Sequence, residues 1–281
     1  MWVSDKWRDF ELIDCSRGEK LERWGNYTLV RPDPQAIWDT PRRDGRWRDC
    51  DGKYTRSESG GGAWDKRRLP ASWQIRYGEL TFNIKPMNFK HTGIFPEQAA
   101  NWDYIMRKIR SAGREISVLN LFAYTGGASL AACAAGADTT HVDSVKQVVT
   151  WARENMELSG LDGIRWIVED ALKFVQREVR RGNRYHGIVL DPPAYGRGAN
   201  GEKWILEDNI CEMLECCARL LEPRGAFLVL NLYSMGLSST LARTAVRQAF
   251  GAPRTEQYGE LCFTDRAGKQ LPLGTYYRFT R

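Results

Sequence analysis

The sequence predicts an α/β fold: a doubly wound, mostly parallel sheet with an antiparallel C-terminal hairpin, preceded by a small, mainly β domain. Three observations support this. Short apolar runs alternate with amphipathic stretches from Val118 onward, two strand-like segments close the chain, and residues 1–85 carry short aromatic strands between Gly and Pro turns. Alternating strand and helix signals indicate right-handed βαβ crossovers, which give a parallel sheet with helices on both faces.

Five strand and helix pairs make up the predicted sheet, each an apolar run followed by a stretch of helical period. In order they are ISVLNLF with GGASLAACAAG, TTHVD with VKQVVTWARENMEL, IRWIVED with ALKFVQREVRRG, HGIVLDPP with EDNICEMLECCARLL, and GAFLVLNL with SSTLARTAVRQAF. TEQYGELCFT and GTYYRFT then predict a hairpin around DRAGKQ, which places an antiparallel strand in the sheet. We expect residues 86–281 to form this domain.

Residues 1–85 are expected to form a separate small β-rich domain; contact with RNA or another substrate is one role open to it, and the sequence does not give its role. WQIRYGELTFNI predicts a hairpin, and SESGGGA, residues 57–63, predicts a flexible tip. Residues 42–90 hold 12 Lys/Arg against 6 Asp/Glu, with aromatic residues between the charges, a composition that suits phosphates and stacked bases. The alternative, which composition alone favours, is a solvated arginine-rich surface over packed tryptophans.

The composition excludes several classes of protein. The chain has 281 residues, 42% of them hydrophobic, which is enough for a sizeable core. The first residues lack a secretion signal and no stretch approaches a membrane span, so we expect a cytoplasmic protein with no membrane partner. Seven scattered cysteines are typical of reduced core thiols, and with three histidines no metal site is expected. The oligomeric state is not predicted.

The turn after the first strand of the sheet predicts a nucleotide-type cofactor site. In VLNLFAYTGGASLAACAAG the strand leads into Thr125, Gly126 and Gly127 and then into a helix of small residues. Glycines let a ligand approach the backbone closely, and the first amides of a helix can bind a carboxylate or phosphate. A tight turn without a ligand is the alternative.

Acidic residues follow the next three strands. Asp143 comes about 20 residues after the glycines, where an acid accepts hydrogen bonds from ribose hydroxyls, although Asp143 or Ser144 could instead cap the following helix. Glu169 and Asp170 end the third strand, where a polar side chain can meet an adenine amino group, although both acids could instead cap the following helix. Asp191-Pro192-Pro193 ends the fourth strand as a stiff, open loop, because two prolines forbid helix and further ladder pairing. Together these strand ends indicate a site at the carboxyl edge of the sheet.

The motifs favour one family over another. Adenosine-binding dehydrogenases share the first two features, but carry G-x-G-x-x-G where this chain has AYTGGA, and have no need of Asp-Pro-Pro. The combination resembles class I methyltransferases that use S-adenosylmethionine. NLFAYTGG, HVDSVKQ, the Glu169-Asp170 pair and DPPAYG more closely resemble the large-subunit ribosomal-RNA base methyltransferases of the cytosine-C5 and guanine-N7 group. HTGIFPEQ, residues 91–98, matches the segment that these enzymes place over the cofactor.

The resemblance, which covers roughly residues 85–250, implies a Rossmann-like methyltransferase domain that binds S-adenosylmethionine. It implies cofactor contacts from Phe95 and Gln98 on the N-terminal flank, from Asn120, Phe122, Ala123, Tyr124, Thr125, Gly126 and Gly127 around the methionine part, from Asp143 and Ser144 at the ribose, from Asp170 and Ala171 at the adenine, and from Asp191 at the methyl group. It also implies a catalytic loop of Asp191, Pro192, Pro193 and Tyr195.

Two features depart from the cytosine enzymes. Those enzymes attack the ring with a cysteine near the end of the fifth strand, where this chain has Asn231-Leu232-Tyr233-Ser234. The nearest candidate thiol, Cys211, lies in the predicted helix ICEMLECCARLL, and its side chain is expected to be buried in the protein core. Their usual RNA-binding module also has no evident counterpart here. Without a cysteine, the simplest mechanism is direct attack of a base nitrogen on the sulfonium methyl, which the protein positions and desolvates.

Several residues near this loop keep open roles. Asp191 or neighbouring carbonyls can accept an exocyclic N–H, and Tyr195 either stacks on an extruded base or merely covers the loop. GRGANGEKW, residues 196–204, is either a mobile lid or a surface loop without a special role. The sequence leaves open whether Asn231, Tyr233 or Ser234 contacts the target.

We therefore expect a cytoplasmic S-adenosylmethionine-dependent methyltransferase (EC 2.1.1.-) that acts on a base nitrogen of ribosomal RNA. One alternative is methylation of a protein side chain or small molecule. Another is a non-catalytic RNA-binding or assembly factor, against which the presence of Gly126, Gly127, Asp143 and Asp191 argues. The sequence gives neither the target nucleotide and atom nor whether the substrate is naked RNA or a ribosomal particle.

Overall fold

The protein is described by a computed structural model that covers residues 2–57, 61–87, 90–198, 201–233 and 237–281. By its packing the chain divides into two units. The sheet unit comprises Met1–Trp2, Ala100–Leu261 and Gly274–Arg281, and the β unit comprises Val3–Ala99 and Cys262–Leu273. A functional boundary at residue 85 stays a prediction. Three predicted features, parts of the 57–63 tip and of the 196–204 loop and Ser234, lie outside the described residues.

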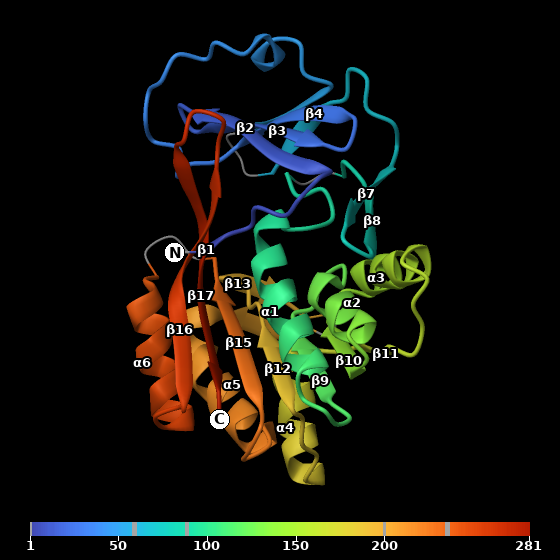
Figure 1. The fold of residues 1–281 in the computed structure, drawn as a ribbon, viewed down its shortest axis with the longest axis vertical. Coiled ribbons are helices and arrows are strands. Elements are labelled where there is room, and N and C mark those ends of the chain that lie inside the picture. The colour runs from blue at the N-terminus through green and yellow to red at the C-terminus, as the bar shows by residue number, and fades with distance from the viewer. Residues whose placement is uncertain (1, 58–60, 88–89, 199–200, 234–236) are drawn as a thin grey trace. The chain divides into compact units, whose positions relative to one another are not determined.

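The sheet unit is built on an eight-stranded sheet with the order β1-β16-β17-β15-β12-β9-β10-β11 (Figure 1). Strands β9, β10, β11, β12 and β15 are parallel, and β17 pairs antiparallel with β15, which confirms the predicted sheet and its closing strand. The strands are β1 (Trp2–Val3), β9 (Ser117–Leu121), β10 (Asp138–Asp143), β11 (Arg165–Val168), β12 (Gly187–Leu190), β15 (Phe227–Leu232), β16 (Thr255–Thr264) and β17 (Gln270–Thr280).

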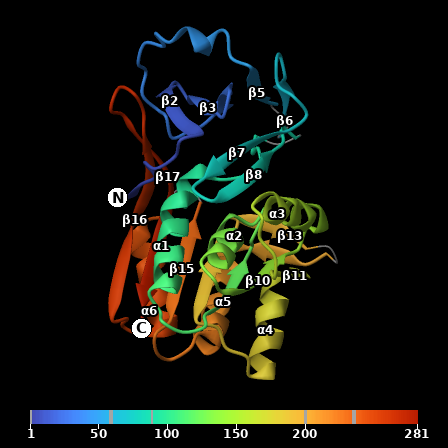
Figure 2. The ribbon, with the colours of Figure 1, turned by 45° about the vertical axis from the view of Figure 1, so that its right-hand side comes forward.

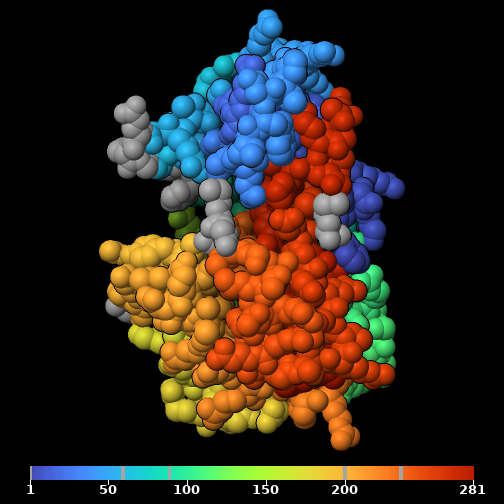
Figure 3. All heavy atoms as spheres, turned by 90° about the vertical axis from the view of Figure 1, so that its left-hand side faces the viewer, coloured from blue at the N-terminus to red at the C-terminus, as the bar shows by residue number. Residues whose placement is uncertain are grey.

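Helices cover both faces of this sheet, as the alternating pattern predicts (Figures 1 and 2). They are α1 (Ala99–Arg110), α2 (Gly127–Ala134), α3 (Lys146–Leu158), α4 (Ala171–Arg181), α5 (Leu206–Leu220) and α6 (Ser239–Phe250). Side chains of α1 and α2 pack with Val118, Val189 and Val229, whereas α4, α5 and α6 pack with Leu119 and Leu190 on the opposite face. Figure 3 views the molecule from the side of α6. We call the first face the α1 face.

Helix α1 is not among the predicted elements. It follows a short 3₁₀ turn, η2 (Pro96–Gln98), whose first residue is a proline, a residue suited to the start of a helix. Trp102, Ile105 and Ile109 are buried along one side at helical spacing. This helix was not predicted, because its segment directly follows the HTGIFPEQ motif, which was interpreted as a cofactor-covering segment.

The β unit contains a five-stranded sheet of β2 (Phe10–Ser16), β3 (Glu19–Trp24), β4 (Tyr27–Pro32), β5 (Gly52–Arg56) and β6 (Gly62–Asp65). A short 3₁₀ turn, η1 (Gly45–Trp47), precedes β5. Strands β7 (Trp73–Tyr77) and β8 (Leu80–Ile84) form the predicted hairpin. Ile13, Leu21, Val30 and Cys50 form one core cluster, so the mainly β character of the N-terminal region is confirmed.

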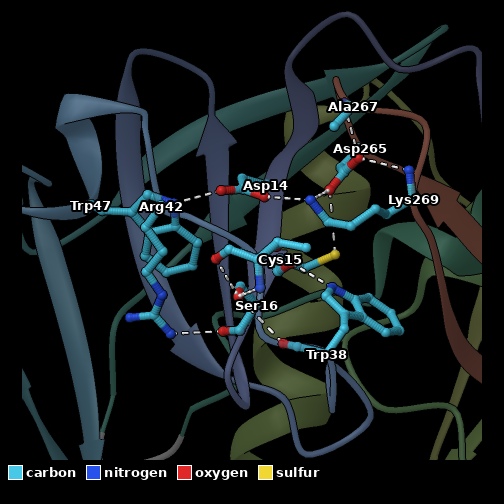
Figure 4. A network of polar contacts seen from close by, with 10 residues as sticks. Asp14, Cys15, Ser16, Trp38, Arg42, Trp47, Asp265, Ala267 and Lys269 are labelled. Carbon is cyan, nitrogen blue, oxygen red and sulfur yellow. Dashed lines mark hydrogen bonds and ion pairs between the residues drawn. The ribbon is translucent and has the colours of Figure 1, made fainter.

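The turn between β16 and β17 packs into the β unit, beside β2 (Figure 4). Lys269 Nζ lies 2.8 Å from Asp14 Oδ1 and 2.8 Å from Asp265 Oδ2. Cys15 Sγ donates to Asp265 Oδ2 at 3.6 Å. Burial raises the pKa of the Cys15 thiol to about 12, and the Asp265 charge adds to this. The thiol is therefore a protonated, structural donor.

The seven cysteines are free thiols. Cys15, Cys50, Cys217 and Cys262 are buried, as predicted, but Cys211 is exposed. The expectation for Cys211 is wrong because the buried side of α5 is formed by other residues, among them Met213, Leu214, Cys217 and Leu220.

Candidate functional site

The candidate site lies at the point where the order of the strands in the sheet reverses, between β9 and β12. Strand β9 pairs with β10 on one side and with β12 on the other, so the two halves of the sheet start from adjacent strands. In open α/β sheets ligands bind outside the carboxyl ends of the strands at such a switch point. The loops after β9, β10, β11 and β12 carry the predicted site residues to this edge.

The loop after β9 has an unusual backbone. Phe122, Tyr124 and Gly126 have positive φ values of 54°, 48° and 91°. A left-handed conformation costs a non-glycine residue on the order of 1–3 kcal/mol and persists only where its surroundings enforce it. Asn155 of α3, which is fully buried, donates to the Thr125 carbonyl at 3.0 Å and so helps hold the loop.

The first turn of α2 presents backbone amides at this edge. Gly126 occupies the N-cap position and, in the described part of the chain, no side chain caps the helix. The amides can therefore bind a carboxylate. A Cβ at Gly127 would lie 2.5 Å from Trp102 Cζ2, so the close approach of α1 requires glycine there.

Asp143 connects the loop after β9 with the end of β10. Its Oδ2 accepts from the Tyr124 amide at 2.9 Å and its Oδ1 from the Val145 amide at 3.0 Å. Burial raises the pKa of Asp143, and these amides, with that of Ser144, oppose the rise. Each carboxylate oxygen has a second lone pair, which leaves acceptors for two hydroxyls of a ribose.

Asp170 caps α4. Its Oδ1 accepts from the Lys173 amide at 2.9 Å, so the capping alternative is confirmed. Glu169 forms two hydrogen bonds with Arg177, both 2.6 Å long. Ala171 is 4% exposed. The contact of Asp170 and Ala171 with adenine stays a prediction.

Asn120 belongs to a buried polar chain beneath the loop. Its Nδ2 donates to Ser129 Oγ at 2.9 Å, and Ser129 Oγ lies 3.0 Å from His141 Nδ1. Burial lowers the pKa of His141 to about 3, so its ring is neutral. Sequence reasoning missed Ser129 and His141, whose role depends on the packing of α2 against β10. Asn120 thus supports the loop from below, and its contact with a cofactor stays a prediction.

The Asp191-Pro192-Pro193 loop is held by Trp204. Its indole Nε1 donates to the Pro193 carbonyl at 2.7 Å, and its ring packs on Phe122 with centroids 4.7 Å apart. Trp204 therefore fixes this loop against the loop after β9. The sequence offered one signal for this role, an aromatic residue within a glycine-rich segment.

Tyr195 follows this loop and its side chain is 51% exposed. It begins β13 (Tyr195–Arg197), which pairs antiparallel with β14 (Lys203–Ile205). Arg197 Nε donates to the Tyr195 hydroxyl at 2.8 Å. The described parts of residues 196–204 thus belong to a small hairpin that presents an aromatic ring to solvent.

Phe95 and Gln98 belong to the β unit. Phe95 precedes η2, and its ring centroid lies 4.9 Å from that of His91. The backbone N–H of Gln98 donates to the Phe95 carbonyl at 3.0 Å. Their contact with a cofactor stays a prediction.

Comparison with known proteins identifies the family. A family model for S-adenosylmethionine-dependent methyltransferases matches residues 43–261. The chain belongs to this family. Its methyl donor is therefore S-adenosylmethionine, as predicted. The site fits this cofactor: the α2 amides suit the carboxylate of its methionine part, and Asp143 suits its ribose. When bound, S-adenosylmethionine supplies an activated methyl group, so the methyltransferase's own residues bind, orient and exclude water.

Solved structures support this assignment. A SAM-dependent methyltransferase from Agrobacterium tumefaciens is 39% identical, with a TM-score of 0.94 over 99% of this chain and 92% of that one. A candidate SAM-dependent methyltransferase from Streptococcus mutans shares the fold, with a TM-score of 0.75, 17% identity and coverage of 98% of this chain and 75% of that one.

Curated relatives match a shorter stretch. A "Ribosomal RNA large subunit methyltransferase K/L" from Shewanella frigidimarina is 30% identical over 59% of this chain and 23% of its own length. The protein of the same name from Syntrophotalea carbinolica is 29% identical over 64% of this chain and 25% of its own length. This methyltransferase thus spans about a quarter of the length of these relatives.

Two kinds of feature are absent from the described residues. They contain no group of three or more His, Cys, Asp and Glu side chains arranged to hold a metal ion. Over the same residues, no helix has the length and apolar character needed to cross a bilayer.

Proposed function

We propose that this methyltransferase transfers a methyl group directly to a nitrogen of a ribosomal-RNA base in the cytoplasm. The observation that carries the proposal is the exposed ring of Tyr195 directly after the rigid Asp191-Pro192-Pro193 loop. An exposed aromatic ring beside a methyl-transfer site suits a base that has left its stack. Ribosomal RNA is supported by the names of the relatives that match 59% and 64% of the chain.

Direct transfer to nitrogen is supported by the residues at the end of β15. The sequence there is Asn231-Leu232-Tyr233, without a thiol that could attack a pyrimidine ring. An unprotonated ring nitrogen, such as guanine N7, has a free lone pair and loses no proton on methylation, so positioning and desolvation suffice. Asp191 would accept an exocyclic N–H of the base or orient it toward the methyl group.

We further propose that the β unit contacts the RNA backbone. Much of the positive charge predicted to serve this purpose is paired within the unit, as in Arg46 with Asp44 and Arg67 with Asp65. Some of the unit's other arginines are exposed, namely Arg43, Arg48, Arg56 and Arg76. These side chains suit phosphate contacts. Because they are few, the affinity for RNA should fall only moderately as the salt concentration rises.

The proposal is tested with ribosomal RNA from a strain that lacks the gene. The purified protein is incubated with this RNA and methyl-tritiated S-adenosylmethionine, and the RNA is digested to nucleosides. We expect label in one N-methylated nucleoside. Label in co-purifying protein, in C5-methylcytidine, or nowhere would contradict the proposal, and cofactor binding without any transfer would favour a binding factor.

Tyr195 offers a matched pair of variants. Tyr195→Phe keeps the ring and loses only the hydrogen bond from Arg197, so we expect kcat/KM for RNA to change little. Tyr195→Ala removes a stacking surface worth about 1–3 kcal/mol, so kcat/KM should fall about 5- to 150-fold. Equal activity of both variants would assign Tyr195 to covering the loop.

A further inference from the structure

Three buried polar side chains, Arg278, Asn101 and Asn231, form a hydrogen-bonded chain on the α1 face from β17 to the end of β15. Arg278 is fully buried among aromatic rings, with its guanidinium carbon 4.3 Å from the centroid of Trp2 and 4.4 Å from that of Tyr104. Its Nη1 lies 3.2 Å from Asn101 Oδ1. Asn101 Nδ2 in turn donates to Asn231 Oδ1 at 2.9 Å. The side chains of Asn101 and Asn231 are 1% and 2% exposed.

These hydrogen bonds determine the orientation of the oxygen and the NH₂ group in the side chains of Asn101 and Asn231. An arginine has hydrogen-bond donors but no acceptor, so Asn101 must turn its oxygen toward Arg278. Asn101 then presents its NH₂ group to Asn231, which must answer with its oxygen. The NH₂ group of Asn231 is therefore turned away from the chain. Because the direction follows from the donor-only guanidinium, it does not depend on how an amide is assigned.

The same strands place Asn231 beside the catalytic loop. Strands β12 and β15 pair in parallel with Leu190 opposite Leu230, so Asn231 of β15 lies next to the point where Asp191 follows the end of β12. Val189 and Val229, two residues earlier, both lie on the α1 face. Since side chains alternate along a strand, Asn231 projects toward this face at the carboxyl edge of the sheet.

We propose that Asn231 is a substrate-recognition residue: its NH₂ group donates to a carbonyl oxygen next to the methyl-accepting nitrogen, and Asn101 and Arg278 position it. The proposal rests on the proposed function and deepens it. Guanine N7 lies close to O6 and cytosine N3 lies beside O2, and both nitrogens have a free lone pair, whereas adenine has no carbonyl oxygen. The target base is then a guanine or a pyrimidine, and adenine is refused because a buried donor would lack its acceptor.

The identity of the methylated nucleoside is the first test, and it needs no variant. In the tritium experiment with ribosomal RNA from the deletion strain, we expect label in an N-methylated guanosine or pyrimidine. Label in N-methylated adenosine would overturn this inference while leaving the proposed function intact. Absence of label from RNA would overturn both.

Asn231→Asp tests the donor itself. At neutral pH the carboxylate still accepts from Asn101 but has no hydrogen to donate to the base. We expect kcat/KM for the RNA to fall about 10- to 100-fold with the dissociation constant of S-adenosylmethionine unchanged. Asn209→Asp is the control, because Asn209 already serves as an acceptor, from the Ile205 amide at 2.9 Å. Weaker cofactor binding by Asn231→Asp would show that the donor serves the cofactor and would overturn the inference.

The pH profile separates recognition from a structural role. A protonated carboxyl regains an O–H donor, and burial favours this neutral form. The kcat/KM of Asn231→Asp should therefore recover toward the wild-type value as the pH is lowered. A deficit that does not change with pH would contradict a donor role.

Asn101→Asp tests the chain of amides without altering the recognition residue. The carboxylate of this variant would accept from Arg278 and, having no hydrogen, would force Asn231 to turn its NH₂ group inward and its oxygen toward the base. We expect a loss of kcat/KM similar to that of Asn231→Asp, with cofactor binding retained. This variant also decides the case if Asn231→Asp fails to fold, and full activity of Asn101→Asp would refute the positioning role.

Discussion

At the scale of single residues, the site is a set of backbone groups held in place by side chains. The strand-end acids were predictable because the carboxyl ends of parallel strands must meet at one edge of the sheet. Ser129 and Asn101 were not predictable, since each acts through a partner that only the packing of helices brings near. Asn101 and Arg278, for example, are separated by 177 positions.

We expect Asp143 to make cofactor binding depend on pH. Burial raises its pKa above the ordinary 3.8, so the carboxyl becomes protonated at a higher pH than in the unfolded chain. The protonated group accepts poorly from backbone amides and from ribose. We expect the dissociation constant of S-adenosylmethionine, measured by calorimetry, to rise by up to about tenfold per pH unit below that pKa.

The control for this prediction is Asp143→Asn, which has no charge to lose. It should bind the cofactor weakly, because its NH₂ group meets the amides of Tyr124 or Val145, and its affinity should not vary with pH. A wild-type affinity that stays constant down to the ordinary aspartate pKa of 3.8 would refute the role of the carboxylate.

Gly127 is a position where a single methyl group would clash with a packed aromatic ring. A Cβ there would press on the Trp102 ring, so Gly127→Ala should lower the free energy of unfolding by about 1–3 kcal/mol and weaken cofactor binding. Gly45→Ala is a suitable comparison, because a Cβ at Gly45 meets nothing within 4 Å. Chemical denaturation and calorimetry of both variants measure the two effects, and equal behaviour would show that Trp102 yields easily.

At the scale of elements, amphipathic periodicity located the helices α2 to α6 and the strands between them. It did not reveal α1, whose segment continues a motif that the resemblance had already assigned to the cofactor. The pairing of β16 with β17 was predictable from two strand-like runs around a polar turn. Which strand of the hairpin would border β15 was not, because either has the required side chains.

The cap of α4 permits a test that separates stability from adenine binding. Asp170→Ser keeps an oxygen for the Lys173 amide, whereas Asp170→Ala leaves that amide without its cap. We expect Asp170→Ala alone to lose about 1 kcal/mol of unfolding free energy. If Asp170 also contacts adenine, both variants will bind S-adenosylmethionine more weakly than the wild type. Unchanged affinity in Asp170→Ser would limit Asp170 to its role as a cap.

At the scale of the whole molecule, the charge of each segment was predictable from its composition, but the pairing of those charges was not. The excess of basic residues in positions 42–90 suggested an open positive surface, yet several of these arginines bind carboxylates of the same unit. Ion pairs of this kind depend on which loops the fold brings together. Composition therefore overstates the positive charge that is available to a partner.

A buried ion pair makes the β unit sensitive to acid. Burial alone would raise the pKa of Glu22, but Arg31, at 2.6 Å, and Lys20, at 3.4 Å, hold it at about 2 instead of the ordinary 4.5. Because the folded-state pKa is depressed, this stabilisation is complete above about pH 4.5 and is lost as the pH falls toward 2. We expect the free energy of unfolding of the wild type to drop steeply over that range.

Glu22→Gln removes the charge and leaves Arg31 buried without it. We expect a loss of about 3–5 kcal/mol at neutral pH and a weaker dependence on acid, measured by denaturant unfolding. Asp39→Asn breaks the exposed pair with Arg17 and should change stability by less than about 1 kcal/mol. A similar small effect of Glu22→Gln would mean that solvent reaches the pair.

The course of the C-terminal hairpin has a consequence for how the protein is made. Residues 262–273, at the tip, complete the β unit, and residues 274–281 complete the central sheet beside β15. During synthesis, neither unit can close its core until these residues have left the ribosome. Residues 3–99 must therefore wait, with Asp14 and Glu11 lacking their partners Lys269 and Arg266, while the whole of the segment 100–261 is translated.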